Sequence, residues 1–137
     1  MKSIHFVNFL KFLISLALLN ISSKSVFAQN GMNLVGDWKG ESICQVKNSP
    51  CHDEIVVYHI KKENDPGKFQ ADADKIVNGQ LQNMGTLHFI YDQKNKTFTC
   101  IFKNGTFKFI IKDDRMEGSL IMTDKVLYRL ISFKKEK

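Results

Sequence analysis

The stretch CQVKNSPCHDE, Cys44 to Glu54, gathers more reactive side chains than any other part of the chain. Two thiols bracket six residues, and an imidazole and two carboxylates follow at once. These groups could bind a metal, attach a haem, exchange electrons or form a structural cross-link. Haem attachment of the c type and thioredoxin-like redox chemistry both need two residues between the cysteines. The spacing of this pair therefore excludes both.

A metal site needs more converging ligands than this stretch offers. Adjacent side chains of an extended chain point to opposite faces, so only His52 and Glu54 would converge. Two ligands are too few for a tetrahedral zinc ion, and Cys44 and Cys51 could complete the set only as free thiolates. No hydrolase, phosphate-loop, zinc-protease or dinucleotide-binding motif occurs elsewhere in the chain. We therefore assign no metal, no cofactor and no catalytic residue.

A cross-linked turn fits the stretch best. If residues 45–50 form the loop of a hairpin, Cys44 and Cys51 face each other at close to disulfide distance. The chain has three cysteines, so Cys100 would be a buried thiol left over from an odd count. The alternative disulfide is Cys44–Cys100, because both side chains could face inward.

The N-terminal residues have the three parts of a secretory signal peptide. A positively charged head is followed by the apolar run FLISLALL and by Val-Phe-Ala ending at residue 28. An uncleaved anchor is the alternative, but a spanning helix needs about 20 apolar residues. We predict a leader over 1–28 and a single exported domain over 29–137, periplasmic or secreted. After removal of the leader we expect no membrane span.

The charge of the chain does not point to a nucleic-acid partner. The formal net charge is +6, but three of the 20 basic residues lie in the predicted leader, so the domain carries +3. A nucleic-acid interface would gather Arg and Lys on one face. Arginine is limited to Arg115 and Arg129. We expect either a small hydrophobic ligand or another exported protein as the partner.

Turn signals recur at intervals of about ten residues after residue 30. They divide the chain into segments with two-residue alternation, at 36–46, 54–62, 68–75, 84–91, 97–103, 106–112, 115–123 and 126–134. Every connection is short enough for a hairpin, and a long twisted meander removes its edges by closing on itself. The sequence therefore predicts an all-β fold, an up-and-down antiparallel barrel of eight strands.

The segment GDWKG, Gly36 to Gly40, opens the first predicted strand, and Arg129 lies in the last one. Gly-x-Trp at the start of an eight-stranded meander, with a late basic residue, resembles the lipocalin and wider calycin pattern. The resemblance implies a lipocalin-like barrel in which Arg129 packs over Trp38. A guanidinium over an indole face is favourable. Trp38 and Arg129 would then be structural residues that close one end of the barrel.

Large apolar side chains alternate along the fifth, sixth and seventh predicted strands and should point inward. They are either plain core or the lining of a cavity, and small-molecule sites combine an apolar lining with a few polar groups. With two polar anchors, the predicted ligand-binding residues are Tyr58, His88, Phe98, Phe102, Phe107, Phe109, Met116 and Met122.

Two functions follow from these patterns. The first is an exported barrel that holds a small apolar ligand between its inward side chains. The alternative is a solid-core interaction or inhibitor protein that contacts another exported protein through its loops, especially 45–53 and 76–84. Whether side chains fill the interior decides between the two.

Overall fold

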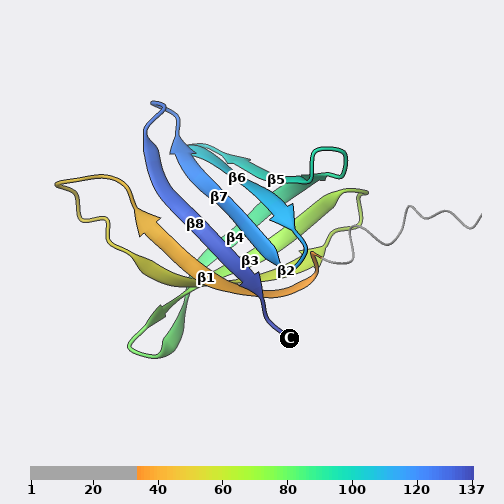
Figure 1. Cartoon of the computed structure of the whole chain (residues 1–137), viewed down its shortest axis with the longest axis horizontal. Helices are drawn as coiled ribbons and strands as arrows, with labels where there is room; N and C mark the ends of the chain where they lie inside the picture. Colours follow the sequence, from red (N-terminus) through yellow and green to blue (C-terminus); the bar gives the residue numbers. More distant parts are fainter. Residues whose placement is uncertain (1–33) are drawn as a thin grey trace, which may run out of the picture.

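The chain folds into a closed barrel of eight antiparallel strands that follow one another in chain order, as Figure 1 shows. The computed structural model describes residues 34–137, so the predicted leader lies outside the described residues. The strands are β1 (Gly36–Cys44), β2 (Glu54–Lys62), β3 (Lys68–Val77), β4 (Gln80–Asp92), β5 (Thr97–Phe102), β6 (Gly105–Lys112), β7 (Arg115–Met122) and β8 (Leu127–Lys135). The predicted all-β, up-and-down fold is confirmed. Between residues 34 and 137 there is no helix long and apolar enough to cross a bilayer.

The connections of the barrel divide into two ends, because alternate connections of an up-and-down barrel lie on the same side. We call one side the loop end; it carries the connections 45–53, 78–79, 103–104 and 123–126. The terminal end carries the other connections, and both β1 and the described chain begin there. The loop end is on the left in Figure 1.

The largest departure from the predicted strands lies between β3 and β4. The segment 76–84, expected as a loop, continues both strands around a two-residue turn, Asn78-Gly79. Both turn residues have positive φ, 52° and 79°, which is the geometry that Asn-Gly favours in tight hairpins. Ile76 is therefore paired with Leu81. Residues 76–84 project from the barrel as a hairpin, which we call the arm (Figure 1).

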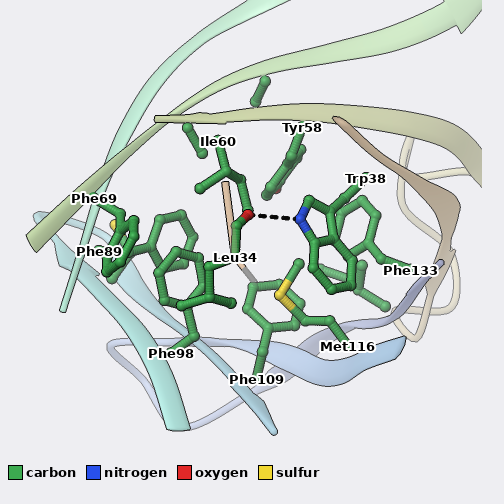
Figure 2. Packing of buried hydrophobic residues seen from close by; sticks show 14 of the residues in the cluster. Leu34, Trp38, Tyr58, Ile60, Phe69, Phe89, Phe98, Phe109, Met116 and Phe133 are labelled. Carbon is green, nitrogen blue, oxygen red and sulfur yellow. Dashed lines mark hydrogen bonds between the residues drawn. The ribbon is translucent and has the colours of Figure 1, made fainter. Parts of the chain in front are cut away.

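Buried apolar side chains form one cluster in the interior of the barrel. Trp38, Phe98 and Phe109 are each 0% exposed, and burying such large rings contributes most to the stability of a small core. Leu34 lies beside Trp38, and its carbonyl oxygen accepts a 2.8 Å hydrogen bond from the indole Nε1 (Figure 2). Among the described residues, no buried side-chain nitrogen or oxygen lacks a hydrogen-bond partner.

The barrel closes where β1 meets β8, and a glycine makes this approach possible. Gly40 pairs with Phe133. A Cβ atom at position 40 would fall on the carbonyl oxygen of Ser132. Glycine inside a strand commonly marks such a close approach of two backbones. The second glycine of the GDWKG segment therefore serves closure of the sheet.

The β1–β8 ladder also separates two residues that the resemblance placed together. Trp38 pairs with Lys135, whereas Arg129 pairs with Cys44, because the last residues of one antiparallel strand meet the first residues of the other. The cation over the Trp38 ring is Lys135 Nζ, 5.8 Å from the ring centroid. Arg129 lies instead over Tyr128, 5.6 Å from that centroid. The predicted contact between Arg129 and Trp38 is therefore wrong.

Candidate functional site

A disulfide holds the base of loop 45–53 at the loop end. Cys44 and Cys51 are bonded, with their Cα atoms 5.9 Å apart. This confirms the favoured pairing and excludes Cys44–Cys100. Cys100 is free and buried, and burial raises the pKa of its thiol. The disulfide therefore fixes the two ends of the loop relative to each other.

Arg129 ties the same loop to the barrel wall. Its Nη1 donates to the carbonyl and hydroxyl oxygens of Ser42 and to the carbonyl oxygen of His52, each at 3.2 Å. Its Nη2 lies 3.3 Å from Glu54 Oε2, and both side chains are only 13% exposed. Glu54 is shared with Lys75, whose Nζ lies 3.4 Å from Oε1. Arg129 is thus a structural residue of the loop end that joins β1, β2 and β8.

We expect Arg129→Gln to lower the free energy of unfolding by about 2 kcal/mol, because several charged hydrogen bonds are lost from a poorly solvated position. Chemical denaturation measures the change. The matched control is Arg115→Gln, since Arg115 is exposed and an exposed charge contributes little. Equal losses in the two variants would contradict the structural role of Arg129.

His88 lies on the outer wall, and its predicted inward position is wrong. Its Nδ1 is 2.6 Å from Glu63 Oε1, and the side chain is 70% exposed. The neighbouring Phe89 is 1% exposed, so alternation along β4 turns His88 outward. Apolar residues on both sides of a histidine indicate a strand, but they do not show which face of the strand the histidine occupies.

A groove of about 540 Å³ adjoins His88 on this outer wall. Its lining includes Ile90 and Ile101, which are 63% and 79% exposed. Strands β4 and β5 pair only over residues 90–92 of β4. The groove opens where this pairing ends. This hollow therefore lies outside the barrel and away from the predicted ligand-lining face.

Four of the predicted ligand-binding residues lie in the core. Phe98, Phe109 and Met116 are 0% exposed, and Tyr58 is 4% exposed. The Tyr58 ring packs 4.6 Å from that of Phe133, centroid to centroid. Burial raises the pKa of the Tyr58 hydroxyl. All four belong to one cluster of buried residues, which is how packed core residues are arranged.

The other three apolar residues of that set lie together at the loop end. Phe102, Phe107 and Met122 are partly buried and pack against the core. The rings of Phe102 and Phe107 are stacked with their centroids 5.6 Å apart. Gly105 pairs with both Phe102 and Met122, so the three side chains surround one turn. They are the predicted lining residues that solvent still reaches.

The arm is an ordered element of the loop end, where the sequence analysis predicts only a loop over 76–84. Its nine residues, IVNGQLQNM, include no charged side chain, although 25% of the chain is charged. Val77, Leu81 and Met84 are 42%, 56% and 44% exposed. Asn-Gly between apolar residues is a strong hairpin signal and could have identified the arm. Depletion of charge around exposed apolar groups is typical of the centre of a protein interface.

Hydrogen bonds anchor the base of the arm to the outer wall. A β-bulge falls between Ala73 and Asp74. Asp74 Oδ2 lies 3.1 Å from His59 Nε2, and Asp74 Oδ1 accepts a 2.9 Å hydrogen bond from Asn83 Nδ2. Asn83 Oδ1 in turn accepts a hydrogen bond from the backbone N–H of Gly85. The arm therefore begins at a braced bulge.

Comparisons with known proteins support the fold and assign no family. No protein-family model matches the chain, and no curated protein matches it. The chain is similar to a solved structure described as a redesigned β-barrel, with a TM-score of 0.59 and 9% sequence identity. The match covers 77% of this chain and 94% of that chain. Within residues 34–137, no three His, Cys, Asp or Glu side chains are grouped to hold a metal ion.

Proposed function

We propose that the protein is an exported binding module with a solid barrel, and that it contacts another exported protein through its loop end. The observation that carries this proposal is the arm. It is an ordered hairpin outside the barrel, with an uncharged sequence and exposed Val77, Leu81 and Met84. Exposed apolar side chains that are gathered on one projecting element are typical of a protein interaction site.

The buried aromatic core favours protein contact over a deep ligand pocket. A small-molecule site keeps its apolar lining accessible and adds a few polar groups that await the ligand. Here Phe98, Phe109 and Met116 are 0% exposed. Between residues 34 and 137, no buried side-chain nitrogen or oxygen is without a hydrogen-bond partner. The exposed apolar side chains include Leu81 in the arm and Ile90 and Ile101 on the outer wall.

Two features support an exported, calycin-like barrel. The Cys44–Cys51 disulfide suits an oxidising compartment, in agreement with the predicted leader, and both the periplasm and the medium would meet that condition. The Gly36-x-Trp38 opening and the closed meander of eight strands are similar to those of lipocalins. Lys135 stands over the indole where the resemblance implied an arginine.

A second candidate function is the binding of a small apolar ligand at the loop end. The observation that favours it is the partly exposed cluster of Phe102, Phe107 and Met122. A ligand there would rest on the stacked rings of Phe102 and Phe107 instead of entering the core. An extra mass that leaves the native protein on denaturation would identify such a guest.

The proposal is tested with a photo-crosslinking benzophenone amino acid placed in the arm. We expect a group at Leu81, 56% exposed, to capture one exported protein from extracts of the producing cells. A group at Ile110, 51% exposed on the outer wall, should not. Leu81→Ser should then weaken binding of the purified partner by about tenfold or more, as a loss at the centre of an interface does. Equal crosslinking or equal weakening at Leu81 and Ile110 would contradict the proposal.

A further inference from the structure

The imidazole of His59 lies on the outer wall between two carboxylates. Its Nδ1 is 2.7 Å from Asp37 Oδ1, and its Nε2 is 3.1 Å from Asp74 Oδ2. An ionised carboxylate only accepts hydrogen bonds, and a neutral imidazole has a single N–H to donate. Both contacts are therefore hydrogen bonds only when both ring nitrogens carry protons.

We propose that His59 is a proton-operated clamp that holds the base of the arm against the barrel wall. The clamp runs from Asp37 on β1 through His59 on β2 to Asp74 on β3, and from there to Asn83 on the β4 side of the arm. Loss of the proton leaves one ring nitrogen with a lone pair that faces a carboxylate. The contact to Asp37 is the shorter one, so the contact to Asp74 is the one that opens.

The surroundings of His59 favour its charged form. The ionisable side chains around it on the outer wall are Asp37 and Lys39 from β1, Lys61 from β2, and Asp72 and Asp74 from β3. Hydrogen bonds from Thr86, Gln70 and Lys61 lower the pKa of Asp72 to about 2. Asp72 is therefore charged throughout the range in which a histidine titrates. Lys61 Nζ lies 3.1 Å from Asp72 Oδ2. The positive charge of Lys61 is therefore paired with Asp72 and not with His59.

The direction of the pH effect follows from the same contacts. The hydrogen bond to Asp37, with a further contribution from Asp74, raises the pKa of His59 against an opposing effect of burial. A group whose pKa is raised by folding stabilises the structure fully below its unfolded pKa and loses that effect as the pH rises through the folded value. The clamp is therefore closed in mildly acidic solution and opens towards alkaline pH.

The clamp is tested on the protein alone, by amide hydrogen exchange of the arm at residues 76–84. Between about pH 6 and about pH 9, on either side of the histidine range, we expect the arm protection factors to fall. The fall should be about two- to fivefold, the effect of losing one partly solvated charged hydrogen bond. In His59→Gln the protection factors should be independent of pH. The matched control is His88→Gln, which removes an outer-wall histidine with a single carboxylate partner and should behave as the wild type.

Two results would overturn the clamp: constant protection in the wild type, or a parallel fall in the wild type and in His59→Gln. Should His59→Gln not fold, Asp74→Asn serves the same comparison, because an amide can pair with either form of the imidazole. The effect of the clamp on partner binding rests on the proposed function. If arm protection depends on His59 but crosslinking from position 81 fails, the result contradicts the proposed function and does not contradict the clamp.

Discussion

Phe98→Ala is expected to lower the free energy of unfolding by about 3–5 kcal/mol, the usual cost of removing a fully buried ring. Phe98 is 0% exposed. Its ring is stacked on that of Phe89, with centroids 4.2 Å apart, and meets the ring of Phe69 edge-on at 5.8 Å. The neighbouring rings are held on β3 and β4, so they can collapse only partly into the space that the ring leaves. Urea denaturation measures the loss.

The control for this prediction is Phe102→Ala, which removes the same side chain from the loop end. Phe102 is only partly buried, so its removal takes less apolar surface out of contact and should cost about 1–2 kcal/mol. A loss in Phe98→Ala no greater than in Phe102→Ala would mean that Phe98 borders open space. Binding of a small apolar ligand inside the barrel would then be the favoured function.

The double variant Cys44→Ser/Cys51→Ser is expected to lose about 2.5 kcal/mol, the chain-entropy value for closing an eight-residue loop. The bond joins positions seven apart in sequence and so constrains the unfolded chain. The contact from the Cys44 backbone N–H to Asp53 Oδ1, at 2.8 Å, survives the substitution. Thermal or urea unfolding with and without a reductant measures the effect.

Reduction provides an internal control for the disulfide. A reductant should bring the wild type down to the stability of the double variant and leave the double variant unchanged. Cys100 stays reduced in both proteins, because it is free and buried. Wild-type stability that does not respond to complete reduction would contradict a stabilising role for the Cys44–Cys51 bond.

The fold could be predicted because its signals are local and repeated. Two-residue alternation and short polar turns specify antiparallel hairpins one at a time, and closure follows from the need to remove free edges. The Cys44–Cys51 bond was predictable for the same reason, since both cysteines flank one loop of a hairpin. The arm differs from the predicted loop 76–84 because Asn78-Gly79 forms a tight two-residue turn, and a turn this tight extends its strands.

The contacts of Arg129 and His88 could not be predicted, because they depend on register across strands distant in sequence. Pairing of Trp38 with Lys135 and of Cys44 with Arg129 follows from where β8 begins and ends, which the local sequence pattern does not specify. For His88, a shift of one residue in alternation exchanges the inner face for the outer face. The apolar pattern of β4 does not fix that choice by itself.

The buried aromatic interior and the exposed apolar side chains of the arm together direct attention to the surface of the loop end. There the disulfide and Arg129 fix loop 45–53, while His59 and Asp74 brace the arm. A rigid barrel that positions variable connections is a common arrangement for binding. The two elements leave from neighbouring hairpins, so one partner could contact both.

The filling of the barrel is tested most directly by titrating the wild-type protein with benzene while following the methyl signals of its methionines by NMR. Dry apolar cavities bind benzene, whereas packed cores do not. Met116 is 0% exposed in the core, and Met122 is partly buried at the loop end. We predict that the Met116 methyl signal stays unchanged, with Phe98→Ala as the positive control. A saturable shift of Met116 in the wild type would show an open interior and contradict the solid barrel.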